Sequence, residues 1–145
     1  MLIEQKNSKK QGDVGMAVAI SYFAIKGDTV SVPLTDSQAY DLLVDDGTSI
    51  YRVQVKTVYY KKPGKKNYEV ELRTHGGNRS GTGKVKHFDH TVVDILFVLT
   101  ENMVQYSIPV EKFSNISTLT LSKDYDKYIV SKHAGTVMTV NYGRL

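Results

Sequence analysis

The chain has 145 residues, enough for one domain with a substantial core, and its 41% hydrophobic and 23% charged residues are ordinary for a globular protein. The lack of cysteine excludes disulfides and thiolate metal sites, and no apolar run approaches the roughly 20 residues that a membrane span needs. The net charge of +4 is modest and MLIEQKNSKK has no apolar secretion segment, so we expect a cytoplasmic protein with one domain over residues 1–145.

The first predicted element is a helix over residues 12–26, within KKQGDVGMAVAISYFAIKG. Apolar side chains surround most of its circumference, so we expect a largely buried helix. Gly27 follows as a natural C-cap, because glycine tolerates the left-handed conformation at that position. Residues 28–33, DTVSVP, are predicted to form a short strand that Pro33 ends.

Two strands are predicted on either side of a turn at Asp46–Gly47, a dipeptide that favours hairpins. The first lies in YDLLVDDG, residues 40–47, and the second in SIYRVQVKTVYYKK, residues 49–62, the longest strand candidate. A basic turn, KPGKK at residues 62–66, leads to NYEVELRT at residues 67–74. Alternating apolar residues there predict a strand that pairs back onto residues 49–62.

The second half of the chain combines a loop, two strands and shorter elements. HGGNRSGTGK at residues 75–84 predicts a surface loop, and it departs from the phosphate-binding P-loop because Asn78 replaces that motif's first glycine and Val85 its Ser or Thr. VVDILFVLT, residues 92–100, predicts a buried strand, and MVQYSIPV, residues 103–110, a further one. Short helices are predicted near Pro109 and within residues 122–130, and residues 135–145 can add a strand. Because helices do not alternate with strands, we expect a mixed sheet of the α/β (α+β) class.

Positive charge is concentrated between residues 56 and 86, which hold nine Lys and Arg against Glu69 and Glu71. This density suits a polyanion such as nucleic acid, whose binding depends on neutralising phosphates. The alternative is a solvated hairpin whose lysines protect the edge of a sheet. Tyr59 and Tyr60, beside the basic turn, can stack on DNA or serve as structural hairpin residues. The residues predicted to bind DNA are Lys61, Lys62, Lys65, Lys66, Arg73, Arg79, Lys84 and Lys86.

Three polar residues are predicted to meet on one face of the hairpin. On an extended strand, side chains two residues apart point the same way, so Arg52, Gln54 and Lys56 share a face. Asp41 begins the neighbouring strand, and a hairpin would bring it close to Gln54 and Lys56. A carboxylate and an amide oxygen are hard ligands that suit Mg²⁺, and a lysine beside them can stabilise charge on a phosphate. The alternative is an exposed polar strand face.

The stretch YDLLVDDGTSIYRVQVKT resembles the core of the PD-(D/E)XK nuclease superfamily, in the small branch of homing endonucleases from cyanobacterial group I introns, which accepts the Gln of QVK. KKQGDVGMAVAISYFAIKGDTVSVPLTDSQAYDLLVDD resembles that family's opening helix and strands, and VVDILFVLTENMVQYSIPVEKF its later strand pair. The resemblance implies a restriction-endonuclease-like core, a mixed sheet flanked by helices. It also implies a Mg²⁺-dependent DNA endonuclease that cuts a specific duplex site as a homo-oligomer, a dimer or tetramer. By this resemblance Asp41 and Gln54 are catalytic metal ligands, and Lys56 is the catalytic lysine.

One position departs from the family. In GDVGM, Met16 stands where the family commonly has an acid, and a soft thioether does not coordinate Mg²⁺. Asp13, one turn earlier, or Glu4 can take over that role, although the simpler expectation for Asp13 is a helix N-cap. The departure leaves three functions open: a homing-type endonuclease, which we favour, a structure-specific nuclease of the Holliday-junction-resolvase type, and a catalytically weakened DNA-binding member.

Overall fold

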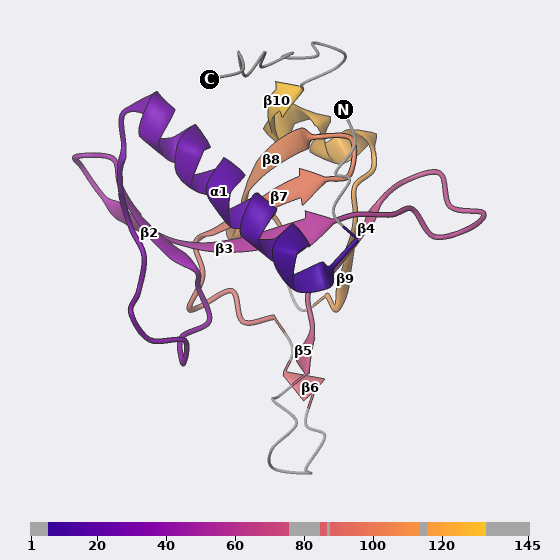
Figure 1. Ribbon diagram of the computed structural model, residues 1–145, viewed down its shortest axis with the longest axis horizontal. Coiled ribbons are helices and arrows are strands. Elements are labelled where there is room, and N and C mark those ends of the chain that lie inside the picture. The colour runs from indigo at the N-terminus through magenta and orange to yellow at the C-terminus, as the bar shows by residue number, and fades with distance from the viewer. Residues whose placement is uncertain (1–5, 76–84, 87, 114–115, 133–145) are drawn as a thin grey trace, which may run out of the picture.

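The computed structural model describes residues 6–75, 85, 86, 88–113 and 116–132, and one mixed sheet organises this part of the chain (Figure 1). Its six strands run in the order β1-β2-β3-β7-β8-β10, and helix α1 lies across one face. Two pairs of short strands, β4 with β9 and β5 with β6, form separate two-stranded sheets. The predicted mixed sheet is therefore confirmed. Among the described residues, no helix has the length and apolarity to cross a bilayer.

The helix and strands of the main sheet have these bounds: α1 Ser8–Lys26, β1 Thr29–Ser31, β2 Leu42–Asp45, β3 Ile50–Val58, β7 Ile95–Thr100, β8 Val104–Pro109 and β10 Ile129–Lys132. The smaller sheets consist of β4 Glu69–Glu71, β9 Thr118–Thr120, β5 Thr74–His75 and β6 Val85–Lys86. The helices predicted near Pro109 and within residues 122–130 are short 3-10 helices, η1 Val110–Lys112 and η2 Lys123–Tyr128. The predicted strand at 135–145 and the loop at 76–84 lie outside the described residues.

Helix α1 begins four residues before its predicted start, because Asn7 caps it. The Asn7 side-chain oxygen accepts hydrogen bonds from the backbone N–H groups of Lys9 and Lys10 at 3.0 and 3.3 Å. The prediction that Asp13 caps the helix is therefore wrong: Asp13 lies inside the helix and is exposed. Gly27 ends the helix with φ 101°, as predicted from its tolerance of the left-handed region.

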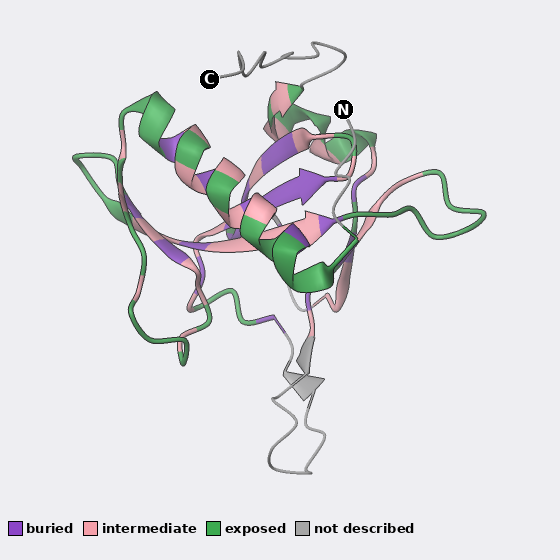
Figure 2. Ribbon diagram, viewed as in Figure 1, coloured by how far each residue is buried: buried purple, intermediate pink, exposed green. Residues whose placement is uncertain are grey.

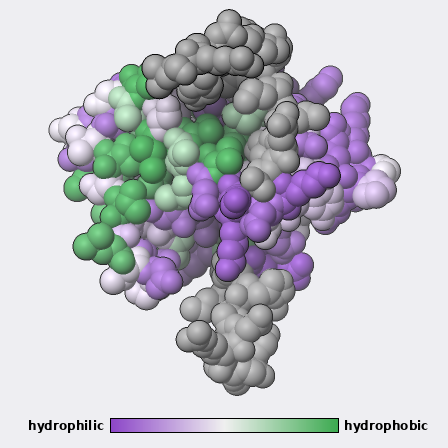
Figure 3. Space-filling view, viewed as in Figure 1, coloured by the Kyte–Doolittle hydropathy of each residue, from purple (hydrophilic) through white to green (hydrophobic). Residues whose placement is uncertain are grey.

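The burial of α1 is one-sided, in contrast to the predicted burial around most of its circumference. One stripe with a four-residue spacing is buried, while Ile25 on another side is 85% exposed (Figure 2). The wide apolar surface seen in the sequence thus remains partly uncovered in this chain, and Figure 3 shows hydrophobic groups gathered over the helix. The buried stripe consists of Gln11, Gly15, Ala19 and Phe23.

Gly15 is the point at which α1 comes closest to the sheet. A Cβ atom at this position would overlap the Thr57 side-chain oxygen, well inside the 3.0 Å that real Cβ atoms essentially never cross. It would also meet a methyl group of Val55 at 3.5 Å. Because only glycine leaves room for this approach, Gly15 sets the distance between the helix and β3.

The predicted hairpin at Asp46–Gly47 is confirmed. The Asp46 side-chain oxygen accepts hydrogen bonds from the backbone N–H groups of Thr48 and Ser49, both at 2.8 Å, and Gly47 has φ 88°. Strands β2 and β3 pair antiparallel through this turn, while the other edge of β3 pairs parallel with β7. The hairpin therefore places β3 inside the sheet.

The predicted pairing of residues 67–74 with β3 is wrong. Strand β4 pairs instead with β9, with Val70 opposite Leu119. Strand β2 pairs with β3 only over Ile50–Val53, so the edge of β3 is not fully occupied. The difference comes from packing, because Val70 of β4 and Leu119 of β9 are buried together in one apolar cluster. Strand β4 therefore finds its backbone partner 49 residues further along the chain, in the pair Val70–Leu119.

Two apolar clusters cover the two faces of the sheet. The cluster under α1 contains Ala19, Phe23, Leu42, Val44, Val53 and Phe97. The cluster on the other face includes Leu72, Leu96, Val98, Ile108 and Leu119. Strand β7 contributes to both, and its residues from Leu96 to Thr100 are all buried, as its continuous apolar run predicted. Because side chains alternate along β3, its even-numbered residues point away from α1.

Candidate active site

Asp41, Gln54 and Lys56 come together on the face of the sheet opposite α1. Asp41 directly precedes β2, and its backbone N–H donates a hydrogen bond to the Val53 carbonyl at 2.8 Å. The Asp41 Oδ2 atom accepts a hydrogen bond from the backbone N–H of Val55 at 2.7 Å. Lys56 follows Gln54 by two residues and points the same way. All three line one cleft of about 710 Å³. The predicted convergence thus results from the turn and the two-residue period of the strands.

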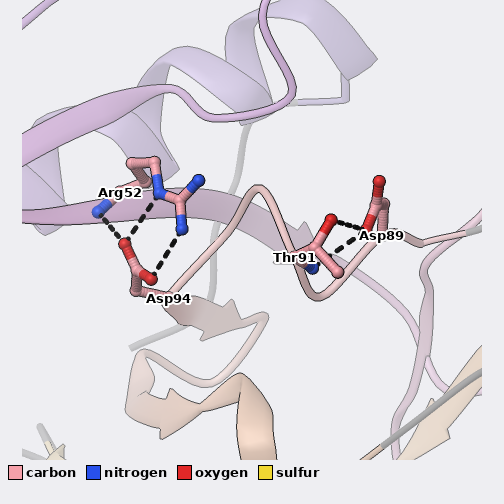
Figure 4. A network of polar contacts seen from close by, with 4 residues as sticks. All are labelled: Arg52, Asp89, Thr91 and Asp94. Atoms are coloured by element: carbon pink, nitrogen blue, oxygen red, sulfur yellow. Dashed lines mark hydrogen bonds and ion pairs between the residues drawn. The ribbon is translucent and has the colours of Figure 1, made fainter.

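The cleft has walls from several parts of the chain. The loop 36–39, which leads to Asp41, forms one section, and Leu72 and the segment 88–93 form others. Two further carboxylates, Asp36 and Asp89, line the cleft; both residues are exposed. Asp89 accepts hydrogen bonds from the backbone N–H and the hydroxyl of Thr91 at 2.9 and 2.6 Å (Figure 4). Sequence reasoning missed these two acids, because no periodicity or spacing connects their loops to β3.

The charged groups in the cleft are partly removed from water. Burial raises the pKa of Asp41, while the Val55 hydrogen bond and the Lys56 charge act in the opposite direction. Burial lowers the pKa of Lys56, against the charges of Asp41 and Glu71. Each charge therefore carries a desolvation cost that a ligand of opposite charge would relieve. A cleft with such perturbed groups is a candidate functional site.

The Gln54 side chain has an oxygen whose hydrogen bonding is not satisfied by the described residues. Its side-chain oxygen, Oε1, is buried and has no hydrogen-bond partner among the described residues. Leaving a buried acceptor unsatisfied costs about 1–3 kcal/mol, so such atoms are uncommon unless a ligand or water fills the place.

The donor set of the cleft suits a hard cation. The Asp41 carboxylate and the Gln54 amide oxygen are the oxygen donors that Mg²⁺ prefers, and Mg²⁺ usually takes only one or two carboxylates besides water and substrate phosphate. Within the described residues, no group of three or more His, Cys, Asp and Glu side chains could hold a metal ion. The residues present therefore fit Mg²⁺ shared with a phosphate better than a metal enclosed by protein.

Met16 lies apart from this cleft. Its side chain is half-buried and packs against the apolar cluster under α1, and it is not among the residues that line the cleft. The expectation that position 16 faces the metal site therefore disagrees with the packing of the helix. Asp13 is exposed and does not line the cleft either, and Glu4 lies outside the described residues.

Arg52 shares the strand face with Gln54 and Lys56, but its guanidinium is engaged elsewhere. Its Nε and Nη2 atoms donate to the two carboxylate oxygens of Asp94, both at 2.9 Å, and its backbone N–H donates to Asp94 at 2.8 Å (Figure 4). Asp94 directly precedes β7, so this fork joins the beginnings of the two parallel strands. It supports the strand that carries Gln54 and Lys56.

The basic span is less positive than its sequence indicates. Lys62 and Lys65 both form ion pairs with Glu69, at 2.7 and 3.3 Å. Arg73 pairs with Glu71 at 2.6 Å. The loop between β3 and β4 nevertheless forms a hydrophilic end of the molecule (Figure 3). Of the other predicted DNA contacts, Lys61 and Lys66 are exposed, the Lys86 side chain is not described, and Arg79 and Lys84 lie outside the described residues.

Comparisons with known proteins agree with this geometry. Residues 6–134 match the family model described as PD-(D/E)XK endonuclease. Among solved structures, the bacterial homing endonuclease I-Ssp6803I is similar, with 27% sequence identity, a TM-score of 0.69, and coverage of 88% of this chain and 85% of that chain. No curated protein sequence matches the chain. The fold is thus restriction-endonuclease-like, as the resemblance implied, and the chain belongs to the PD-(D/E)XK endonuclease family and is a DNA endonuclease.

Proposed function

We propose that this endonuclease is Mg²⁺-dependent and hydrolyses phosphodiester bonds at a specific site in duplex DNA, in the manner of homing endonucleases. The observation that carries the proposal is the meeting of Asp41, Gln54 and Lys56 in one cleft, with the buried Gln54 oxygen left without a partner. The likeness to a homing endonuclease supports the class of substrate.

Asp41 and Gln54 would hold the metal ion. The Asp41 carboxylate is oriented by the Val55 N–H, which occupies part of one oxygen and leaves the rest of the carboxylate available. Gln54 adds a neutral oxygen that requires a partner. When bound, Mg²⁺ supplies positive charge at the phosphate and lowers the pKa of water that it holds.

Lys56 would act on the phosphate directly. Its ammonium group lies in a partly desolvated cleft, where a charge interacts more strongly than in bulk water. A phosphate gains negative charge on its outer oxygens during attack, so Lys56 stabilises the transition state more than the bound substrate. We assign Lys56 to charge stabilisation and to no proton transfer.

A homo-oligomer, a dimer or tetramer, is part of the proposal. One cleft of this kind is present per chain in the described part, and hydrolysis of both strands in a single binding event needs two. A symmetric assembly provides the second cleft with matching orientation. Light scattering of the purified protein at several concentrations measures the assembly, and a monomer at concentrations that cut both strands would contradict this part.

Cleavage of long duplex DNA of diverse sequence, in millimolar Mg²⁺ and with a chelator as control, tests the function. Asp41→Asn and Lys56→Ala should each lower the cleavage rate by at least about 10²-fold. Lys26→Ala is the matched control, because Lys26 pairs with Asp28 outside the cleft and should leave cleavage unchanged. Fixed fragment lengths would establish a specific site, whereas cleavage of four-way junctions alone would favour the resolvase type.

Measurements of metal binding and of DNA binding distinguish the role of Asp41 as a metal ligand from the role of Lys56 at the phosphate. Calorimetric titration of Mn²⁺ or Mg²⁺ into the protein–DNA complex should show much weaker binding for Asp41→Asn, while Lys56→Ala should bind DNA within a few-fold of the wild type. Asparagine keeps an oxygen that can accept from the Val55 N–H, so the backbone contact survives. Metal affinity like that of the wild type in Asp41→Asn would remove Asp41 from the metal site.

A further inference from the structure

A second cleft adjoins the first and meets it at Lys56. It has a volume of about 420 Å³, within the roughly 300–1,000 Å³ typical of sites for small ligands. Among the described residues, Lys56 alone lines both clefts. A DNA strand whose phosphate lies at Lys56 would therefore have a neighbouring nucleotide at the mouth of this second cleft.

Two exposed tyrosines form part of its lining. Tyr59 and Tyr60 directly follow the last residue of β3, and they are 39% and 54% exposed. Their ring centroids lie 5.5 Å apart, with 51° between the ring planes. Neither belongs to the two apolar clusters of the described fold, so packing does not account for their rings. Adjacent aromatic faces beside a DNA path are suited to stacking on bases, because every base has a π-face.

The charges around the second cleft are largely balanced. Lys62 pairs with Glu69 and Arg73 pairs with Glu71, and all four residues line the cleft. The two carboxylates disfavour a phosphate there, and Lys62 and Arg73 are already engaged, which leaves Lys56 at the junction with the first cleft. The cleft therefore suits the uncharged, flat part of a nucleotide better than its phosphate.

We propose that the Tyr59–Tyr60 cleft takes an unstacked base of the DNA strand that is cut, next to the phosphate held at Lys56. The inference rests on the proposed function, and it assigns the tyrosines to substrate positioning. The base stacks on one or both rings, and its phosphate remains on the Lys56 side. Holding a base out of the helical stack would fix the position of the adjacent phosphate in the first cleft.

The test measures binding of a twelve-nucleotide single strand of mixed sequence, by fluorescence anisotropy without divalent metal so that nothing is cut. Tyr59→Ala/Tyr60→Ala should bind about 5- to 150-fold more weakly than the wild type, the range that loss of one stacked base produces. Tyr59→Phe/Tyr60→Phe keeps the rings and should bind within about two-fold of the wild type. Circular dichroism and thermal unfolding verify that each variant is folded.

A second probe isolates the base from the backbone. It has the same length, but all twelve nucleotides are abasic, and the wild type and the double alanine variant should bind it equally. An equal loss on both probes, or no loss on either, would overturn the inference. The cleavage assay is independent: ring-dependent binding by a chain that cuts nothing in Mg²⁺ would remove the proposed function alone.

Discussion

The close approach of α1 to β3 gives a quantitative prediction for Gly15→Ala. The new methyl group would overlap the Thr57 Oγ1 atom, while Val55 and the Thr57 Cβ atom, both at 3.5 Å, would be in ordinary van der Waals contact with it. Either the helix moves away from the sheet or Thr57 changes its rotamer. Rotation of the Thr57 side chain is restricted because threonine is β-branched. When its oxygen turns away from the helix, its methyl group can turn toward the helix instead.

Two effects of opposite sign determine the size of the change. Alanine is favoured over glycine inside a helix by about 0.8–1.0 kcal/mol. Overpacking a well-filled core costs about 1–3 kcal/mol. We expect the steric cost to prevail, with a net loss of up to about 2 kcal/mol in the free energy of unfolding. For a chain of this size the melting temperature should fall by about 2–4 °C per kcal/mol.

Chemical denaturation of four proteins measures this effect as a double-mutant cycle: the wild type, Gly15→Ala, Thr57→Ala and the double variant. Thr57→Ala removes the overlapped oxygen, which has no hydrogen-bond partner in the described structure, so the double variant should recover the stability that Gly15→Ala loses. The coupling free energy should lie between about 0.5 and 3 kcal/mol, as for residues in contact.

Gly12→Ala is the matched control in the same helix. A Cβ atom at position 12 would have no heavy atom within 4 Å apart from its chain neighbours and the backbone of its own helix. This variant should therefore gain stability from helix propensity alone. If Gly15→Ala gained as much stability as Gly12→Ala, with no coupling to Thr57, the close approach of α1 to β3 would be refuted.

Three further predictions concern other parts of the fold and site. The hydrogen bonds from Arg52 lower the pKa of Asp94 in the folded protein. The ionised carboxylate therefore stabilises the fold fully at pH values above its unfolded pKa of about 3.9. This contribution is lost as pH falls through the lower pKa of the folded state. Asp94→Asn should therefore melt below the wild type at pH 7, and the difference should shrink as pH falls below about 3.9. A difference that is independent of pH would contradict the ion pair. Met16→Glu should lower stability by more than about 1 kcal/mol, because it places a carboxylate against the apolar cluster under α1, and it should not increase cleavage; a more active variant would mean that position 16 reaches the site. Lys66→Gln should reduce the slope of log DNA affinity against log salt by about 0.9, whereas Lys62→Gln should change it less because Lys62 is paired with Glu69; equal slopes for both variants and the wild type would assign these lysines to a solvated loop.

Local patterns were sufficient for the parts of the fold that depend on neighbouring residues. The Asp46–Gly47 turn fixed the hairpin, and the two-residue period of β3 placed Gln54 and Lys56 on one face. The continuous apolar run from residue 95 indicated a strand buried on both faces. The helix start was misplaced because Asn7, five residues before the predicted start at residue 12, supplies the cap.

The assignment of nuclease function depended on the family resemblance and not on the spacing of the site residues alone. The D, Q and K spacing by itself left an exposed polar strand face as an alternative, and only the ordered set of flanking segments distinguished a nuclease. It also led to an expectation for Met16 that the packing of α1 does not support, because a family pattern gives a position in the chain and not the direction of a side chain.

Local sequence patterns were enough to predict the hairpin, the strand faces and the shared cleft of Asp41 and Gln54. Each of these depends on contacts within about fifteen residues and on backbone geometry that turns and periodicity encode. Tertiary structure decided which strand pairs with β4, which lysines are neutralised by Glu69, and that Tyr59 and Tyr60 share a cleft with Lys56. These features depend on contacts between segments that lie far apart in the sequence. Such contacts form only when the whole chain packs.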